Sequence, residues 1–71
     1  MKLNERQMQM LRQYREAKGW TQAEAASETG VPVFIIGTLE RDGAAHAKNV
    51  RKLVDGLGID DRTFYGLEAA K

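Results

Sequence analysis

The sequence predicts an all-α protein, a compact bundle of five short helices that forms a single domain over residues 1–71. Polar capping residues precede apolar stretches, glycines follow them, and apolar side chains recur within each stretch at helical spacing. A chain of 71 residues buries only about 60% of its unfolded surface, so a small helical core must stabilise it. The expected helices span about residues 4–18, 22–29, 32–41, 47–56 and 61–67.

The first two helices are predicted by capping boxes. Asn4 is followed three residues later by Gln7, and Thr21 is followed by Glu24. Gly19 ends the first helix, and the second, about eight residues long, is too short to be stable without its neighbours. The expected inward face of the first helix is formed by residues at helical spacing, namely Leu3, Gln7, Met10, Leu11, Tyr14 and Ala17, with Trp20 also in the core.

The third helix has an unusual composition. Residues 33–36, VFII, would by themselves be consistent with a buried strand, but the preceding Pro32 and the following TLER favour a helix. Ile36 and Leu39 then face the core, with Ile35 beside Leu39. The opposite face carries Val33, Phe34, Gly37 and Thr38. A glycine inside a helix costs about 1 kcal/mol relative to alanine, which indicates a close approach at Gly37 by a neighbouring helix, a partner or DNA.

The remainder of the chain completes the core. A loop is expected at residues 42–46, followed by a helix whose inward side chains are Val50, Leu53, Val54 and Leu57. Gly58 ends that helix and Ile59 points inward. Asp60 or Asp61 can cap the final helix, which carries Phe64, Tyr65 and Leu67. Residues 68–71 are expected to fray.

Composition excludes several classes of function. The sequence has no cysteine and a single histidine, His46, expected in an exposed loop, so neither a disulfide nor a metal site is predicted. No nucleophile–base pair or phosphate-binding loop is present, so an enzyme with a catalytic or cofactor-binding site is not expected. No apolar run approaches the ~20 residues of a membrane helix, and the polar start MKLNERQ is not a signal peptide. A cytoplasmic protein is the simplest expectation.

Charge is segregated along the chain although the net charge is only +1. Residues 2–18 and 41–52 each have a net charge of +3, whereas residues 24–40 and 55–68 each have −3. The two basic segments form one patch if they meet in space. The alternative is four ordinary solvated helix surfaces.

Several segments resemble one protein family. LRQYREAKGWTQ, residues 11–22, is similar to its Leu-x-x-Leu-Arg-x-x-x-Gly-Leu-Thr-Gln opening, and LVDGLGIDDRTFY, residues 53–65, to its terminal segment. Further matches are Ala26, Gly30-Val31, Ile36, Leu39-Glu40-Arg41 and Gly43. Over about residues 8–67 the chain thus resembles the Cro/C1-type (Xre-like) helix-turn-helix family of phage and bacterial regulators. The resemblance implies a lambda-repressor-like DNA-binding domain with its helix-turn-helix at the second and third helices.

The resemblance implies roles for individual residues. Gln22 matches a position that commonly bonds a DNA phosphate, and Arg15 and Glu40 match a partly buried ion pair between the first and third helices. The base-reading positions correspond to Val33, Phe34, Gly37 and Thr38. If the chain binds DNA, we expect Arg41 and Lys48 to supply further backbone contacts. None of the four base-reading residues is Arg, Lys, Asn or Gln, the types that make bidentate contacts with bases. Contact with a thymine methyl remains available to Val33 or Phe34. Ala25 and Thr29 replace larger apolar residues, so the second helix packs either more loosely or more closely than usual.

Two functions follow as hypotheses. In the first, the protein is a transcriptional regulator that binds double-stranded DNA, as a homodimer built around residues 64–67 or formed only on a two-fold operator. In the second, it is an antirepressor or repressor modulator that binds a repressor or other protein partner. That partner would contact Val33 and Phe34, with or without Ile35, on the third helix.

Overall fold

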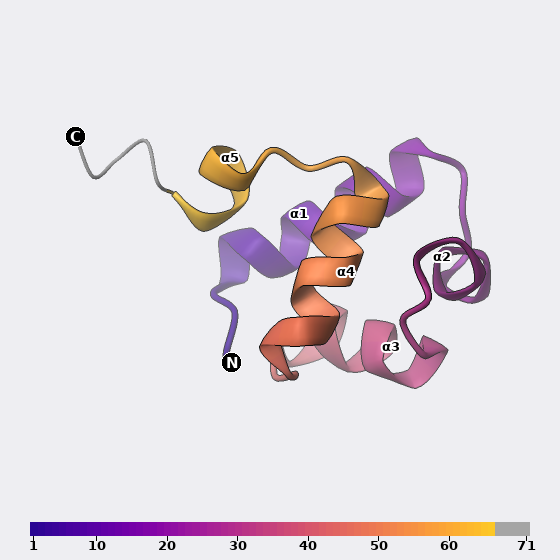
Figure 1. Ribbon diagram of the computed structural model, residues 1–71, viewed down its shortest axis with the longest axis horizontal. Coiled ribbons are helices and arrows are strands. Elements are labelled where there is room, and N and C mark those ends of the chain that lie inside the picture. Colours follow the sequence, from indigo (N-terminus) through magenta and orange to yellow (C-terminus); the bar gives the residue numbers. More distant parts are fainter. Residues whose placement is uncertain (67–71) are drawn as a thin grey trace.

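The computed structural model describes residues 1–66, which form five helices (Figure 1). In chain order these are α1 (Glu5–Ala17), α2 (Gln22–Thr29), α3 (Val33–Arg41), α4 (Ala47–Leu57) and α5 (Asp61–Tyr65). The predicted all-α class is confirmed. Within residues 1–66, β-type backbone pairing is limited to one isolated antiparallel bridge between Lys2 and Ala44. The expected contribution of Leu67 and the expected fraying of residues 68–71 lie outside the described residues.

Helices α1 and α2 begin at the predicted capping boxes. Asn4 accepts a hydrogen bond from the Gln7 amide at 2.8 Å, and the Gln7 side chain accepts one from the Asn4 amide at 3.0 Å. Thr21 and Glu24 make the same reciprocal pair. Of the two candidate caps for α5, it is Asp60 that accepts from the Thr63 amide. These side chains accept hydrogen bonds from backbone amides in the first turn, which have no partner within an α-helix.

The C-terminal ends of the helices agree with the prediction within one or two residues. Helix α4 continues to Leu57, one residue beyond the expected end, and Gly58 follows it in a left-handed conformation with φ 73°. Helix α5 ends at Tyr65, two residues before the expected end, because Gly66 terminates it with φ 72°. Left-handed glycines are the usual stop after a helix because they avoid the steric penalty of a Cβ atom.

The core is formed by one cluster of buried apolar side chains, and α4 lies against both α1 and α2 (Figure 1). The predicted inward faces of α3 and α4 are confirmed, as is the inward position of Ile59, and Phe64 is also buried. Trp20 is half-buried and packs against the cluster. The buried residues are Leu3, Leu11, Ala25, Val31, Ile36, Leu39, Val50, Leu53, Val54, Leu57, Ile59 and Phe64.

The predicted face of α1 is only partly right. Tyr14 and Ala17 are exposed, whereas the inward stripe runs through Met8, Leu11 and Arg15 at steps of three and four residues. The prediction placed apolar residues inward, but here the inward position of the last turn is occupied by an arginine. Arg15 can lie there because Glu40 of α3 neutralises its charge.

Helices α2 and α4 approach each other closely. Ala25 is fully buried, and the Thr29 hydroxyl donates to the Ala25 carbonyl at 2.8 Å. A Cβ atom placed on Gly56 of α4 would lie 2.5 Å from Thr29 Cγ2, which is well inside van der Waals contact. The small residues of α2 therefore produce closer packing, not looser packing, and Gly56 is required by that contact.

The N-terminal segment fixes the loop between α3 and α4. The Leu3 amide donates to the Gly43 carbonyl at 2.8 Å, and the Ala45 amide donates to the Met1 carbonyl at 3.0 Å. Leu3 is buried, and Gly43 has φ 79°.

Within residues 1–66, no helix is long and apolar enough to cross a membrane.

Candidate functional site

Helices α2 and α3 form a helix-turn-helix at one end of the molecule, and α5 lies toward the other end (Figure 1). Gly30 ends α2 with φ 78°, and its amide donates to the Ala26 carbonyl. Val31 is buried and anchors the turn, and Pro32 directly precedes α3 in an extended conformation. The turn is thus fixed by one left-handed glycine, one core residue and one proline, which makes the angle between the two helices well defined.

The first turn of α3 presents two adjacent apolar side chains to solvent. Ile36 and Leu39 are fully buried, whereas Val33 is 47% exposed and Phe34 is 70% exposed. The predicted orientation of α3 about its axis is therefore confirmed. Ile35 is only partly exposed and packs against the core, so it does not extend this surface. We call Val33 and Phe34 together the apolar tip of α3.

Gly37 and Thr38 lie one turn beyond the apolar tip. The Thr38 hydroxyl donates to the Phe34 carbonyl at 2.9 Å. Gln22 of α2 lies over Gly37, and a Cβ atom built on Gly37 would be 3.5 Å from Gln22 Oε1. That distance is an ordinary contact, so packing against α2 does not by itself require glycine at this position. The close approach predicted at Gly37 is therefore not made by any neighbour within residues 1–66, and an alanine would fit there as well.

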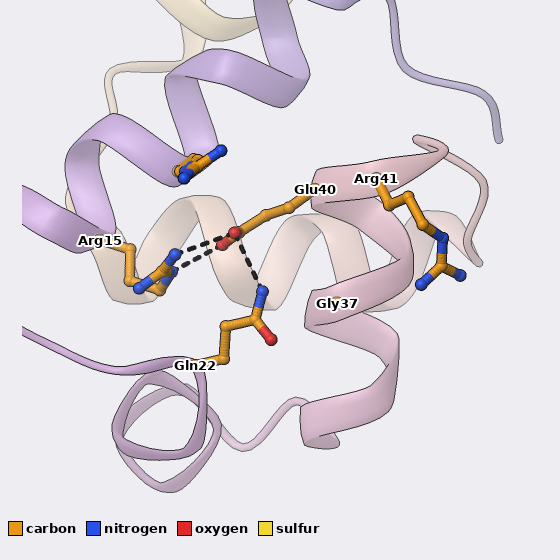
Figure 2. Close-up of a pocket in the computed structure, with 6 residues that line it drawn as sticks. Arg15, Gln22, Gly37, Glu40 and Arg41 are labelled. Carbon is orange, nitrogen blue, oxygen red and sulfur yellow. Dashed lines mark hydrogen bonds and ion pairs between the residues drawn. The ribbon is translucent and has the colours of Figure 1, made fainter.

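An ion-pair network connects α1, α2 and α3 next to this face (Figure 2). Arg15 donates through Nε to Glu40 Oε2 at 2.7 Å and through Nη2 to Glu40 Oε1 at 3.0 Å. Its Nη1 donates to the Trp20 carbonyl at 2.8 Å. The two side chains are only 11% and 7% exposed. The hydrogen bond to Glu40 is the main cause that raises the pKa of Arg15 above its ordinary value, so the guanidinium stays charged.

Gln22 belongs to the same network. Its side-chain amide donates to Glu40 Oε1 at 3.1 Å, and Figure 2 shows it pointing from α2 toward the carboxylate. Both carboxylate oxygens of Glu40 therefore accept hydrogen bonds, and no side-chain nitrogen or oxygen buried within residues 1–66 lacks a partner. The network fixes Gln22 at the start of α2, where the resemblance implied a phosphate contact.

A polar pocket of about 450 Å³ opens beside this network. Two further arginines reach it, one from α1 and one from α3, and both are mostly exposed. Each is paired with a neighbouring carboxylate at 3.2 Å, Arg12 with Glu16 and Arg41 with Asp42. The pocket is lined by Arg12, Arg15, Gln22, Gly37, Glu40 and Arg41 (Figure 2).

The two basic segments meet only in part. Arg12 and Arg15 of the first segment and Arg41 of the second line the same pocket. Arg6 instead donates to the Thr63 and Phe64 carbonyls at the end of α5. Other basic side chains of the two segments, including Arg51, do not line this pocket.

Arg51 is held between Asp55 and Asp61, and the hydrogen bond to Asp61, followed by that to Asp55, raises its pKa. Lys48 is exposed in the first turn of α4. His46, as expected, is exposed before α4. The region proposed for self-association is less available than expected, because Phe64 is fully buried in the core. Leu67, also part of that region, lies outside the described residues.

Arg12 is the pocket residue that the sequence analysis did not identify. It precedes Arg15 by three residues, so the two share a face of α1. Once Arg15 had been matched to the ion pair, this spacing was the available signal for a second arginine beside the third helix.

Comparison with known families agrees with this geometry. A family model described as helix-turn-helix matches residues 11–64, which include α2, the turn and α3. The fold and the site thus define a helix-turn-helix protein. The chain belongs to the Cro/C1-type helix-turn-helix family of DNA-binding regulators. Searches of curated proteins and of solved structures found no match.

Proposed function

We propose that this chain is a small transcriptional regulator of phage or bacterial type that binds double-stranded DNA by placing α3 in the major groove. The observation that carries the proposal is the orientation of α3 within the helix-turn-helix. Ile36 and Leu39 hold one side of the helix in the core, which leaves Val33 and Phe34 exposed at its start. The first turn of the second helix is the part of this motif that reaches base edges.

The chemistry of α3 predicts modest sequence discrimination. Each bidentate contact that is absent forgoes roughly 1–3 kcal/mol of preference for one base. The apolar tip can instead contact the C5-methyl group of thymine, which is exposed in the major groove. Affinity would then come mainly from backbone contacts made by Gln22, Arg41 and Lys48, which orient the protein without reading sequence.

A two-fold operator would require two copies of the chain. Phe64 is buried in the core, so it cannot supply a self-association surface without local unfolding. We therefore expect the homodimer to form on DNA, with the duplex aligning the two copies.

The proposal is tested by fluorescence anisotropy with a duplex selected from a random pool by the wild-type chain. Binding should weaken steeply between about 50 mM and about 200 mM salt, because each phosphate contact releases counterions. Phe34→Ala should weaken binding while circular dichroism stays unchanged, since that side chain is mostly exposed. Absence of wild-type binding at about 50 mM salt would overturn the proposal.

The exposure of Phe34 beside Val33 also supports a second candidate, a repressor modulator that binds a repressor from the same genome. An exposed aromatic side chain next to a β-branched one can anchor a partner helix. This candidate predicts no DNA binding at about 50 mM salt and a complex with that repressor in size-exclusion chromatography. Phe34→Ala should abolish the complex, and a complex that survives this substitution would reject the candidate.

A further inference from the structure

The exposed side of α3 presents an apolar surface to a base edge. Val33 is 47% exposed and Phe34 is 70% exposed, and the two residues are adjacent in the first turn of the helix. Gly37, one turn further on, has no side chain. An apolar surface packs against a methyl group but makes no hydrogen bond. It therefore responds to the C5-methyl group of a pyrimidine and not to the polar groups beside that methyl.

Thr38 has the only polar side chain among the four residues on this side of α3. Its hydroxyl donates to the Phe34 carbonyl at 2.9 Å, so the Thr38 oxygen is left to act as an acceptor. In the major groove, an A·T pair and a G·C pair each carry an amino group, on adenine N6 or on cytosine N4. Thr38 can accept a hydrogen bond from either amino group, so it does not reject one kind of base pair.

Two bases in DNA can present the methyl group that the apolar tip fits. Thymine always carries it, and cytosine carries it at the same ring position when it is methylated at C5. The two bases differ in the neighbouring group, which is the acceptor O4 in thymine and the donor N4–H₂ in cytosine. The side chains of Val33 and Phe34 form no hydrogen bond with either group, so the apolar tip does not distinguish thymine from 5-methylcytosine.

We propose that the apolar tip of α3 recognises 5-methylcytosine as well as thymine, so that methylation of a contacted cytosine increases binding of the chain to DNA. This inference rests on the proposed DNA-binding function and names a substrate class for it, DNA methylated at cytosine C5. Methylation leaves base pairing and the phosphates unchanged, so contacts with the DNA backbone contribute equally to both forms. The difference in affinity comes from the methyl groups that Val33 and Phe34 contact.

The test uses fluorescence anisotropy and the duplex selected from a random pool by the wild-type chain. Each T·A pair is replaced in turn by a C·G pair, and each new duplex is measured with and without a C5-methyl group on the new cytosine. At positions that the apolar tip contacts, the unmethylated cytosine should weaken binding about fourfold per methyl lost. Methylation of that cytosine should restore most of the affinity, whereas methylation of a cytosine in the flanking sequence should have no effect.

Two variants assign the preference to the apolar tip. Val33→Ala/Phe34→Ala should bind the methylated and unmethylated duplexes equally, and its circular dichroism should be unchanged because both side chains are exposed. Tyr14→Ala is the matched control, because it removes an aromatic side chain that is 37% exposed on α1. This variant should keep the wild-type preference for the methylated duplex.

The outcomes separate this inference from the proposed function. If the wild type binds the selected duplex but methylation changes its affinity at no replaced position, the inference is refuted and the proposed function stands. A preference for methylated DNA that survives in Val33→Ala/Phe34→Ala would also refute the inference, since another part of the chain would then read the methyl group. If the wild type does not bind at about 50 mM salt, both are refuted.

Discussion

The buried ion pair between α1 and α3 gives the most decisive prediction about stability. Arg15→Ala removes three hydrogen bonds, two to Glu40 and one to the Trp20 carbonyl. It leaves a carboxylate that is only 7% exposed, with Gln22 as its remaining side-chain partner. Stranding one charge of a buried pair costs roughly 3–5 kcal/mol.

This cost is large for so small a domain. At about 0.05–0.15 kcal/mol per residue, a chain of 71 residues has a free energy of unfolding of roughly 4–11 kcal/mol. A domain of this size loses about 4–8 °C of Tm per kcal/mol, so even the lower estimate of the cost predicts a fall of at least about 12 °C. Arg15→Ala should therefore be marginally stable or unfolded at 37 °C.

The assay is thermal unfolding followed by circular dichroism, with urea unfolding as a second measure. The matched control is the double variant Arg15→Met/Glu40→Leu, which replaces both charges with apolar groups of similar volume. Such replacements are often neutral or stabilising, so the double variant should recover most of the lost Tm. A Tm for Arg15→Ala within about 4 °C of the wild type would refute the argument, as would a double variant no more stable than Arg15→Ala.

Two further predictions concern α2. Gly56→Ala should lower the free energy of unfolding by about 1–2 kcal/mol in urea titrations. The new Cβ would overlap Thr29 Cγ2, and that overlap outweighs the higher helix propensity of alanine. Thr29→Ser keeps the hydroxyl and should recover part of the loss, so equal stability of Gly56→Ala and wild type would contradict the close packing. Thr21→Ala should cost about 1 kcal/mol because it removes the cap that accepts from the Glu24 amide. Thr21→Ser should be nearly neutral in the same titration, and a Thr21→Ala variant as stable as wild type would show that the cap is dispensable.

Local sequence signals predicted the helices and most of the core. Capping boxes at Asn4 and Thr21 depend on residues three positions apart, and the core face of α4 follows from spacing alone. Such signals do not depend on tertiary structure, so they can be read from the chain directly. The same spacing predicted that Ile36 and Leu39 face the core and that the other side of α3 is exposed, and both expectations agree with the observed burial.

The inward face of α1 could not be predicted from hydrophobicity. A search for apolar residues assigns Tyr14 and Ala17 to the core in this part of α1, but Arg15 lies inward instead, paired with Glu40, which is 25 residues away in sequence. Tyr14 is exposed. The Arg15–Glu40 ion pair was predicted from the family resemblance, because hydrophobic periodicity alone does not indicate it.

The pocket and the packing of α2 also depend on tertiary structure. The contact between Thr29 and Gly56 joins two helices that are distant in sequence, so composition allowed either looser or closer packing. Arg12 and Arg41 come from different basic segments, and the sequence does not show which side chains of each segment meet. Arg6 and Arg51 are held by α5 and its neighbours instead.

The central claim is that the apolar tip of α3 contacts base edges in DNA, and the most direct measurement removes the methyl group that it is proposed to contact. Affinity is compared between two alternating DNA duplexes, one of adenine and thymine and one of adenine and uracil on the same deoxyribose backbone. The two differ only in the C5-methyl group. A buried methyl contributes about 0.8 kcal/mol, so the wild type should prefer the thymine duplex by about fourfold per contacted methyl. The double variant Val33→Ala/Phe34→Ala should lose this preference. Equal affinity of the wild type for both duplexes, or a preference that survives in the double variant, would contradict the proposed role of α3.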